Sequence, residues 1–332
     1  MRIKLFNVRE DEAVFAYKWG ELNGHDIVCT NKDLTLNNVD SLKSFDAVST
    51  QRLSQFDQRI YKALKELGIK QIAGRAAGFD MFDLEEASKH GITITNVPSY
   101  SPNAIAEFAV CRALELVRNI NLINKRVNQQ DFTWDKSVIA NEIRNMTVLI
   151  IGVGRIGKVS AQLFNGFGAK VIGYDPYDQS LNNIEYVESL EDGLSRADLI
   201  TLHVPANDET IQMINEQTIH FMKNGAYLVN TSRGATVKSQ DLLNALKSGK
   251  IHSVALDVYD NEFEYFAYDY TNKAIEDDVL VELMSRDDVL ISPHIAFYTS
   301  TAVKNMVEIS LESAVDIVST GKSKNEVSVK KV

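Results

Sequence analysis

Cysteine is scarce in this chain of 332 residues: only Cys29 and Cys111 occur, far apart in the sequence. Both stand among apolar residues, which favours buried free thiols over a disulfide framework. No apolar stretch approaches the ~20 residues needed to span a bilayer, and the first residues, Met1–Phe6, lack the apolar length of a signal peptide. We therefore expect a cytoplasmic protein with no membrane segment.

Positive charge is also in short supply, with 35 Lys and Arg against 45 Asp and Glu, a net charge of −10. The phosphates of a nucleic acid would be repelled by such a chain, so a nucleic-acid partner is not expected. His, Cys and Asp residues do not cluster with metal-ligand spacing, and no metal is expected. Hydrophobic residues make up 45% of the sequence, enough for full cores, and the length suits about two domains.

A glycine-rich turn follows the apolar run Val148–Ile151 and precedes an amphipathic segment. Gly152 allows the tight turn, Gly154 lets a pyrophosphate approach the backbone, and Gly157 lets the helix pack close to the strand. The helix N-terminus offers free N–H groups to phosphates. The next apolar run ends at Asp175, whose carboxylate suits the ribose hydroxyls of NAD and repels the 2′-phosphate of NADP. The pattern therefore predicts an NAD site.

Strand-like and helix-like segments alternate along most of the chain, which predicts an α/β fold of two doubly wound parallel-sheet domains. The segment Glu10–Asn23, for example, has helical spacing of Ala13, Val14, Ala16, Tyr17 and Leu22. Further strands are expected at Arg2–Val8, Asp26–Thr30, Phe45–Thr50, Ile69–Ala73, Ile92–Val97, Lys170–Tyr174, Ile184–Val187, Leu199–Val204, Tyr227–Asn230, Ser253–Leu256 and Val289–Ser292. Further helices are expected at Asp57–Leu67, Leu84–Lys89, Leu190–Ser195, Glu216–Met222 and Gln240–Ser248.

The boundary between the domains is expected at Asn96–Pro102, where two of the five prolines interrupt regular structure. Ser101 can cap a largely apolar helix that begins at Pro102, a position that tolerates proline. A long helix, Thr299–Ser319, is expected to return to the first domain. The predicted domains are residues 1–100 plus 299–332 and residues 101–298.

Three polar residues follow predicted strands of the second domain, where open α/β sheets bind ligands. Arg233 can hold a carboxylate bidentately, although most arginines only form surface ion pairs. His294 is a candidate general acid and base, and a carboxylate such as Glu262 would orient its ring; a lone histidine beside a strand is more often structural. His203 also ends a predicted strand and could line the cofactor pocket.

Over essentially its full length the sequence resembles the D-isomer-specific 2-hydroxyacid dehydrogenases, and most closely their D-lactate dehydrogenase branch. The stretches that carry the resemblance, in this order, are Asn96–Glu107, Gly152–Gly157 with Asp175, Leu202–Pro205, Asn230–Gly234, Asp257–Tyr259 with Glu262, and Ser292–Thr299. The resemblance implies a Rossmann NAD-binding domain inserted into a flavodoxin-like substrate (catalytic) domain, and a homodimer formed through the NAD-binding domains with Trp134 near the partner's active site.

The resemblance also implies roles for individual residues. Arg233, Glu262 and His294 would be catalytic, with His294 as the acid/base, Glu262 as its partner and Arg233 on the substrate carboxylate. Substrate would further contact Ala76, Ala77, Gly78, Tyr100 and Tyr298. The cofactor would contact Gly152, Gly154, Arg155, Ile156, Gly157, Asp175, His203, Val204, Pro205, Thr231, Ser232 and Asp257. The implied reaction is NAD-dependent reduction of a 2-keto acid to the D-2-hydroxy acid, pyruvate to D-lactate foremost.

The sequence departs from the branch at Arg75–Asp80, where Ala76 and Ala77 replace Asn and Val beside the retained Gly78. Arg155 stands where the branch often has histidine. Alternatives within the family are dehydrogenases for larger D-2-hydroxy acids, such as 2-hydroxyisocaproate or phenyllactate, glyoxylate or hydroxypyruvate reductases, and phosphoglycerate dehydrogenase. Outside enzymology, a non-enzymatic NAD-sensing protein on the same fold remains as an alternative; it would not need Arg233, Glu262 and His294.

Overall fold

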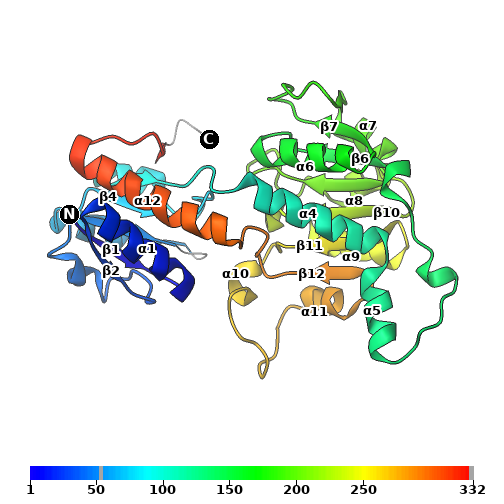
Figure 1. Ribbon diagram of the computed structural model, residues 1–332, viewed down its shortest axis with the longest axis horizontal. Coiled ribbons are helices and arrows are strands. Elements are labelled where there is room, and N and C mark those ends of the chain that lie inside the picture. The colour runs from blue at the N-terminus through cyan, green and yellow to red at the C-terminus, as the bar shows by residue number, and fades with distance from the viewer. Residues whose placement is uncertain (52–54, 329–332) are drawn as a thin grey trace. The chain divides into compact units, whose positions relative to one another are not determined.

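The computed structural model describes residues 1–51 and 55–328 and divides the chain into two compact units (Figure 1). One unit comprises Met1–Ser101 and Tyr298–Val332, and the other comprises Pro102–Phe297. The unit boundaries differ by one residue at each crossing from the predicted 101–298. Residues 329–332 of the predicted return segment lie outside the described residues.

The first unit is built on a sheet in the order β13-β5-β4-β3-β1-β2. Apart from β13, which is antiparallel to β5, its strands are parallel, and the order is the flavodoxin-like one. The strands are β1 (Arg2–Phe6), β2 (Asp26–Cys29), β3 (Ala47–Thr50), β4 (Gln71–Gly74), β5 (Thr93–Thr95) and β13 (Glu326–Val327). The helices are α1 (Glu10–Asn23), η1 (Val39–Leu42), α2 (Arg59–Glu66), α3 (Leu84–Lys89) and α12 (Ser300–Thr320).

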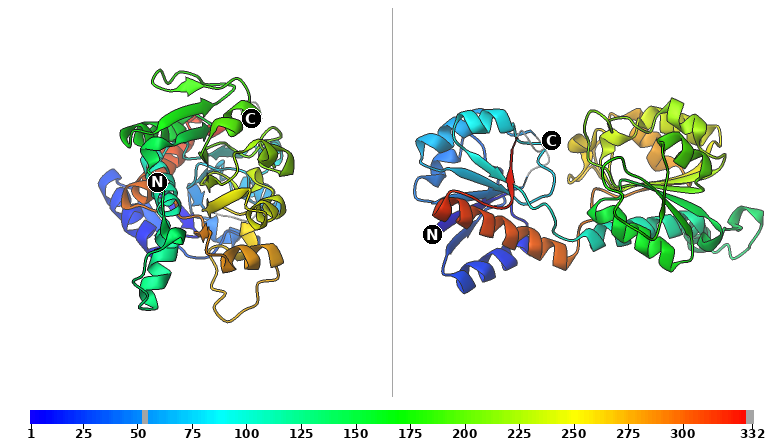
Figure 2. Two further views of the ribbon diagram at one scale, coloured as in Figure 1. Left: turned by 90° about the vertical axis from the view of Figure 1, so that its right-hand side faces the viewer. Right: turned by 90° about the horizontal axis from the view of Figure 1, so that it is seen from above.

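Helices cover both faces of this sheet (Figure 2). On one face α1 and α12 lie side by side, and their buried residues share a core with Ile3, Leu5 and Ala47. On the other face α2 and α3 pack over Phe6, Val48 and Ile72. Successive strand residues point to opposite faces, so the strands of this sheet serve two cores.

The second unit contains a fully parallel sheet in the order β12-β11-β10-β9-β6-β7-β8. The strand order reverses between β6 and β9, as in Rossmann folds. The strands are β6 (Thr147–Ile151), β7 (Lys170–Tyr174), β8 (Glu185–Tyr186), β9 (Leu199–Leu202), β10 (Ala226–Asn230), β11 (Ile251–Leu256) and β12 (Val289–Ile291). The helices are α4 (Pro102–Val117), α5 (Ile120–Asn128), η2 (Lys136–Val138), η3 (Ile143–Asn145), α6 (Arg155–Gly166), α7 (Leu190–Arg196), α8 (Glu216–Phe221), η4 (Gly234–Thr236), α9 (Ser239–Lys247), α10 (Glu262–Tyr265) and α11 (Asp278–Ser285).

The predicted fold class is confirmed by these two sheets, but several local predictions were wrong. Among the described residues, the α-helices and strands that were not foreseen are α5, α10, α11 and β13, and the short 3₁₀ helices η1 to η4 were not foreseen either. The predicted buried thiols were also wrong, since Cys29 is half-buried and Cys111 is exposed on α4. Helix α4 is largely apolar yet leaves one edge exposed, and Cys111 lies on that edge between Glu107 and Glu115. Among the described residues, no helix combines the length and apolarity needed to cross a membrane.

Candidate active site

Three neighbouring strands of the second unit bring the predicted catalytic residues to one edge of its sheet. Arg233 follows β10, Glu262 follows β11 and His294 follows β12, and the three strands pair in parallel in that order. The carboxyl ends of parallel strands lie at the same edge, which is where such sheets bind ligands. Sequence spacing alone could not reveal this, because Arg233 and His294 are 61 positions apart.

The imidazole of His294 and the carboxylate of Glu262 are joined by a short hydrogen bond. His294 Nδ1 lies 2.7 Å from Glu262 Oε1. The other Glu262 oxygen, Oε2, accepts the Tyr259 N–H at 2.9 Å. Glu262 is only 5% exposed, whereas the His294 side chain is 29% exposed. With Nδ1 held by the carboxylate, Nε2 is the nitrogen available for proton exchange with a ligand.

The backbone of His294 adopts an uncommon conformation, with φ +56°. Its N–H donates to the carbonyl oxygen of Asp257 at 2.7 Å and to that of Ser292 at 3.0 Å. Asp257 also accepts hydrogen bonds through its carboxylate, from the Ser292 hydroxyl at 2.5 Å, the Ile295 N–H at 3.0 Å and the Ala296 N–H at 2.8 Å. These hydrogen bonds stabilise the turn that carries His294. Strained backbone positions such as this one concentrate at functional sites.

Asp257 is therefore a buried support of the turn, with an exposed fraction of 2%. Burial raises the pKa of its carboxyl, and the hydrogen bonds from Ser292, Ala296 and Ile295 oppose that rise. Its predicted place beside the nicotinamide stays a prediction. Ser292 and Tyr259 complete this support. Both lie within the stretches that carry the resemblance, but sequence reasoning predicted no role for either residue.

The turn that carries Arg233 is packed directly against the turn that carries Glu262. A Cβ on Gly234 would lie 2.0 Å from the Tyr259 carbonyl oxygen, so only glycine permits this approach. Asn230 holds the same turn: its side-chain amide donates to the Arg233 carbonyl oxygen at 3.0 Å, and its Oδ1 accepts from Ser232. Arg233 is half-buried and donates from Nη1 to the Ser232 carbonyl oxygen at 2.9 Å. The turn that carries Arg233 is thereby fixed relative to the turn that carries Glu262.

The glycine turn after β6 has the geometry that a bound dinucleotide requires. Gly152 has φ +87°, and a Cβ there would meet the His203 carbonyl oxygen at 2.7 Å, at the point where the strand order reverses. Gly157 packs so closely that a Cβ would lie 2.0 Å from the Gly152 carbonyl oxygen. By contrast, nothing lies within 4 Å of a Cβ on Gly154. That open space in front of the N-terminus of α6 fits a pyrophosphate.

Asp175, at the end of β7, is held by three backbone amides. Its carboxylate accepts from the Val153 N–H at 2.8 Å and from the N–H groups of Tyr177 and Asp178 at 2.9 Å each. These bonds place the carboxylate beside the glycine turn and leave lone pairs for ribose hydroxyls, since a carboxylate has about four acceptor positions. The arrangement fits the predicted contact with NAD.

The remaining predicted cofactor residues lie on the same edge of the second sheet. Burial lowers the pKa of His203 to about 3, so this side chain is neutral, and its Nδ1 has no hydrogen-bond partner within the described residues. The buried Thr231 hydroxyl likewise has no hydrogen-bond partner within the described residues. Such unsatisfied polar atoms suit a polar ligand. Ser232 is buried, Ile156 and Val204 are half-buried, and Arg155 and Pro205 are exposed.

The predicted substrate residues Ala76, Ala77, Gly78, Tyr100 and Tyr298 belong to the first unit. The carbonyl oxygen of Ala76 accepts the Val97 N–H at 2.9 Å, and that of Ala77 accepts the Asn96 side-chain amide at 2.7 Å. Asn305 of α12 donates to the Tyr100 carbonyl oxygen at 2.6 Å. These bonds orient both segments.

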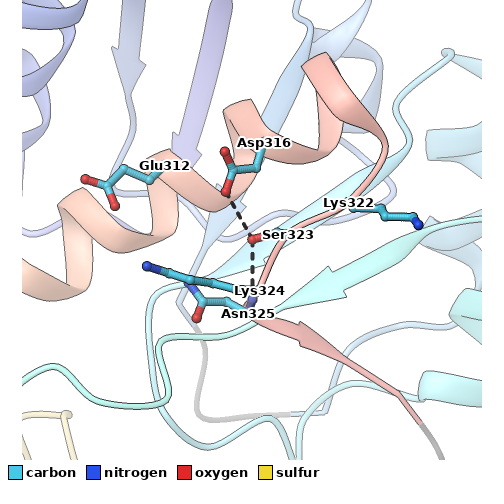
Figure 3. Close-up of a pocket in the computed structure, with 6 residues that line it drawn as sticks. All are labelled: Glu312, Asp316, Lys322, Ser323, Lys324 and Asn325. Atoms are coloured by element: carbon cyan, nitrogen blue, oxygen red, sulfur yellow. Dashed lines mark hydrogen bonds between the residues drawn. The ribbon is translucent and has the colours of Figure 1, made fainter.

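One hollow in the first unit is unrelated to these residues (Figure 3). It is lined by Glu312, Asp316, Lys322, Ser323, Lys324 and Asn325, around the C-terminal end of α12. None of the predicted site residues lines it. Within the described part of the chain, no three His, Cys, Asp or Glu side chains are arranged to hold a metal ion.

Comparison with known proteins decides the family. Residues 110–296 match the family model of the D-isomer specific 2-hydroxyacid dehydrogenase NAD-binding domain. The chain belongs to the D-isomer specific 2-hydroxyacid dehydrogenases. The predicted family and the predicted cofactor, NAD, are thereby confirmed, and the second unit carries the NAD-binding domain.

Relatives match the chain over nearly its whole length. A D-lactate dehydrogenase of Staphylococcus epidermidis is 43% identical over 96% of this chain and 97% of its own. Among solved structures, a D-lactate dehydrogenase of Treponema pallidum superposes with a TM-score of 0.91 at 40% identity, covering 99% of this chain and 100% of that one. A D-2-hydroxyisocaproate dehydrogenase superposes with a TM-score of 0.92 at 36% identity, covering 98% and 99%.

Proposed function

We propose that this protein is an NAD-dependent D-lactate dehydrogenase that reduces pyruvate to D-lactate. The observation that carries the proposal is the His294–Glu262 pair, with 2.7 Å between Nδ1 and Oε1, on strands next to the one that carries Arg233. A proton donor oriented by a carboxylate beside an anion-binding guanidinium is the set that reduction of a 2-keto acid needs. The names of the 43%-identical relatives support the choice of pyruvate.

In this proposal the substrate carboxylate is bound by Arg233 and by the backbone amides of Ala76, Ala77 and Gly78. A guanidinium matches the two oxygens of a carboxylate and also stabilises negative charge that develops on the neighbouring carbonyl oxygen. Tyr100 and Tyr298 contact the rest of the substrate. The first unit then serves as the substrate-binding (catalytic) domain, and the second as the NAD-binding domain.

His294 acts as the general acid in the reductive direction. When bound, NADH supplies the hydride that is added to C2 of the keto acid. The proton on His294 Nε2 passes to the carbonyl oxygen, and Glu262 stabilises the imidazolium before transfer and holds the ring in place. In the oxidative direction neutral His294 accepts the proton from the hydroxyl group.

The nearest alternative is a dehydrogenase for larger D-2-hydroxy acids. It is favoured by the similarity to the D-2-hydroxyisocaproate dehydrogenase and by the small residues Ala76 and Ala77 at the substrate loop. The discriminating experiment is NADH oxidation with pyruvate, 2-ketoisocaproate, phenylpyruvate, hydroxypyruvate and glyoxylate, followed by chiral analysis of the product. The proposal requires the highest kcat/KM with pyruvate and a D product. An L product or a preference for another keto acid would overturn it.

The Glu262→Gln variant should lower kcat for pyruvate reduction, by less than the loss of His294 itself. The glutamine keeps a similar shape, but it carries no charge to stabilise the protonated ring that donates the proton, and it holds the His294 Nδ1 less firmly than the carboxylate does. The Kd of NADH should stay unchanged. Steady-state NADH oxidation and NADH fluorescence titration measure the two quantities. Glu86→Gln, at the His90–Glu86 pair, is the control, and an unchanged kcat for Glu262→Gln would contradict the pairing.

We further infer a cytoplasmic homodimer formed through the NAD-binding domains. Support comes from exposed apolar side chains after α5, with Phe132 73%, Trp134 88% and Ile139 72% exposed. A group of large apolar side chains exposed on one surface is typical of a protein–protein interface, whereas scattered single ones are ordinary. Sedimentation velocity should give twice the 37.2 kDa of the chain, and Trp134→Lys should shift the equilibrium toward monomer. A monomeric wild-type protein at micromolar concentration would refute the inference.

A further inference from the structure

Arg75 and Glu12 form a fully buried ion pair beneath the carboxyl edge of the first sheet. Arg75 Nε lies 3.1 Å from Glu12 Oε1, and both side chains have no solvent exposure. Arg75 Nη2 donates to the carbonyl oxygens of Phe6 and Asn7 at 2.8 Å each, and Nη1 donates to the Ser49 hydroxyl at 3.2 Å. Arg75 therefore ties the ends of β1 and β3 to the start of the loop Ala76–Gly78.

The second oxygen of Glu12 connects this pair to Arg9. Glu12 Oε2 accepts the Arg9 backbone N–H at 3.0 Å and lies 3.5 Å from Arg9 Nη1. The Arg9 guanidinium also donates to both carboxylate oxygens of Asp11, at 3.1 and 3.2 Å, and to Gln51 Oε1 at 3.1 Å. Three side chains thus fix the Arg9 guanidinium: Asp11 and Glu12 at the start of α1, and Gln51 directly after β3.

The held guanidinium lies over the ring of Tyr298, 5.1 Å from its centroid. At this distance a cation is attracted to the face of an aromatic ring. Burial disfavours the charge of Arg9, yet Glu12, Asp11 and a hydrogen bond with Tyr298 raise its pKa, so the charge is constant at all working pH values. The Tyr298 side chain is 48% exposed and so has room to change rotamer if Arg9 is lost.

We propose that Arg9 is a positioning residue that determines substrate specificity. It fixes the position of the Tyr298 ring relative to the loop Ala76–Gly78, because Arg9 contacts Glu12 and Glu12 pairs with Arg75 at the start of that loop. The inference rests on the proposed function, in which the loop and Tyr298 contact a 2-keto acid. The loop binds the carboxylate end, and Tyr298 bounds the side chain on C3. The Arg9–Glu12–Arg75 chain then sets how large that side chain can be.

The test is the ratio of kcat/KM for 2-ketoisocaproate to kcat/KM for pyruvate in Arg9→Met. Methionine keeps the backbone N–H that bonds Glu12 and leaves the buried Arg75–Glu12 pair in place. We expect the ratio to rise about 3- to 10-fold, the effect of releasing one cation–ring contact, through a lower KM for 2-ketoisocaproate. The Kd of NADH should stay unchanged. Arg9→Lys keeps the cation without the fork and should restore part of the wild-type ratio.

The matched control is Arg59→Met, which removes a surface arginine from α2 that also forms an ion pair with a nearby Asp57; its ratio should equal the wild-type ratio. In a Tyr298→Leu background, adding Arg9→Met should leave the ratio where Tyr298→Leu put it. An unchanged ratio in Arg9→Met, an equal loss with both substrates, or a further change in the Tyr298→Leu background would each overturn the inference. Failure of the wild-type protein to reduce either keto acid would instead overturn the proposed function.

Discussion

Replacing His294 with glutamine should reduce kcat for pyruvate reduction about 10²- to 10⁴-fold, the usual loss for a removed general acid. The hydrogen bond from the ring to Glu262, 2.7 Å long, occupies Nδ1 and leaves Nε2 for the proton transfer of the proposed mechanism, and glutamine can neither carry nor deliver that proton. NADH binding should stay close to that of the wild type, because the glycine turn and Asp175 lie on other strands. Steady-state NADH oxidation and NADH fluorescence titration measure the two effects separately.

The backbone at residue 294 calls for a second variant. Its φ of +56° is tolerated better by Asn than by Gln, so His294→Asn separates lost chemistry from a distorted turn. Both variants should lose turnover to a similar extent. His90→Gln is the matched control, since His90 also lies beside a glutamate, 3.1 Å from Glu86 Oε1, but on α3. A His294 variant with near-normal kcat would remove this residue from the acid/base role.

Arg233→Lys should lower kcat/KM for pyruvate about 10²-fold, the scale seen when one stabilising donor to a developing oxyanion is lost. Lysine keeps the charge but offers a point charge instead of a planar fork. The loss should divide between a higher KM and a lower kcat, because in the proposed mechanism the same guanidinium binds the carboxylate and stabilises the carbonyl oxygen. Kinetics over a range of pyruvate concentrations resolve the two.

Arg286→Lys is the control for this substitution. Arg286 also holds a carboxylate with two nitrogens, at 2.8 and 2.7 Å from Asp288, but it does so in a half-buried pair after α11 that includes none of the predicted site residues. Its replacement should leave kcat/KM within about twofold, since partly exposed ion pairs contribute little to stability. If Arg233→Lys were equally silent, the substrate carboxylate would have to be bound elsewhere.

Helix α1 shows where sequence periodicity misleads. The spacing of Val14, Tyr17 and Leu22 contributed to predicting this helix, which is confirmed, but these three residues are 65%, 51% and 75% exposed. The buried face is instead Glu12, Ala16, Trp19 and Gly20. Glu12 on this face pairs with Arg75 inside the unit, and breaking such a pair on one side costs about 3–5 kcal/mol. A carboxylate at the spacing of Ala16 and Trp19 was the signal for it.

The elements missed were short or depended on distant partners. Strand β13 contains two residues and exists through its pairing with β5, more than two hundred residues earlier in the chain. Helix α5 has Ile120, Ile123 and Val127 at helical spacing, but none of its residues is buried, so the core of the unit does not stabilise it. Helix α11 lies in a region of mixed polarity, and its start is capped by Asp277, which accepts the Leu280 N–H. A cap such as Asp277 is a local signal that the sequence does offer, whereas local patterns carry little information where an element is stabilised by a remote strand.

The amino-acid sequence by itself determined the α/β alternation, the glycine turn with its acidic partner, and hence the NAD-binding unit, because strand and helix periods and glycine geometry act over short spans. It also named Arg233, Glu262 and His294, through motifs. Only the tertiary structure decided that these three stand on adjacent strands, that Asp257, Ser292 and Tyr259 hold the turns in place, and that Arg9 reaches Tyr298 while sharing Glu12 with Arg75. Those contacts join residues up to 289 positions apart, from Arg9 to Tyr298, and such pairings depend on how the sheet and its covering helices bring distant turns together.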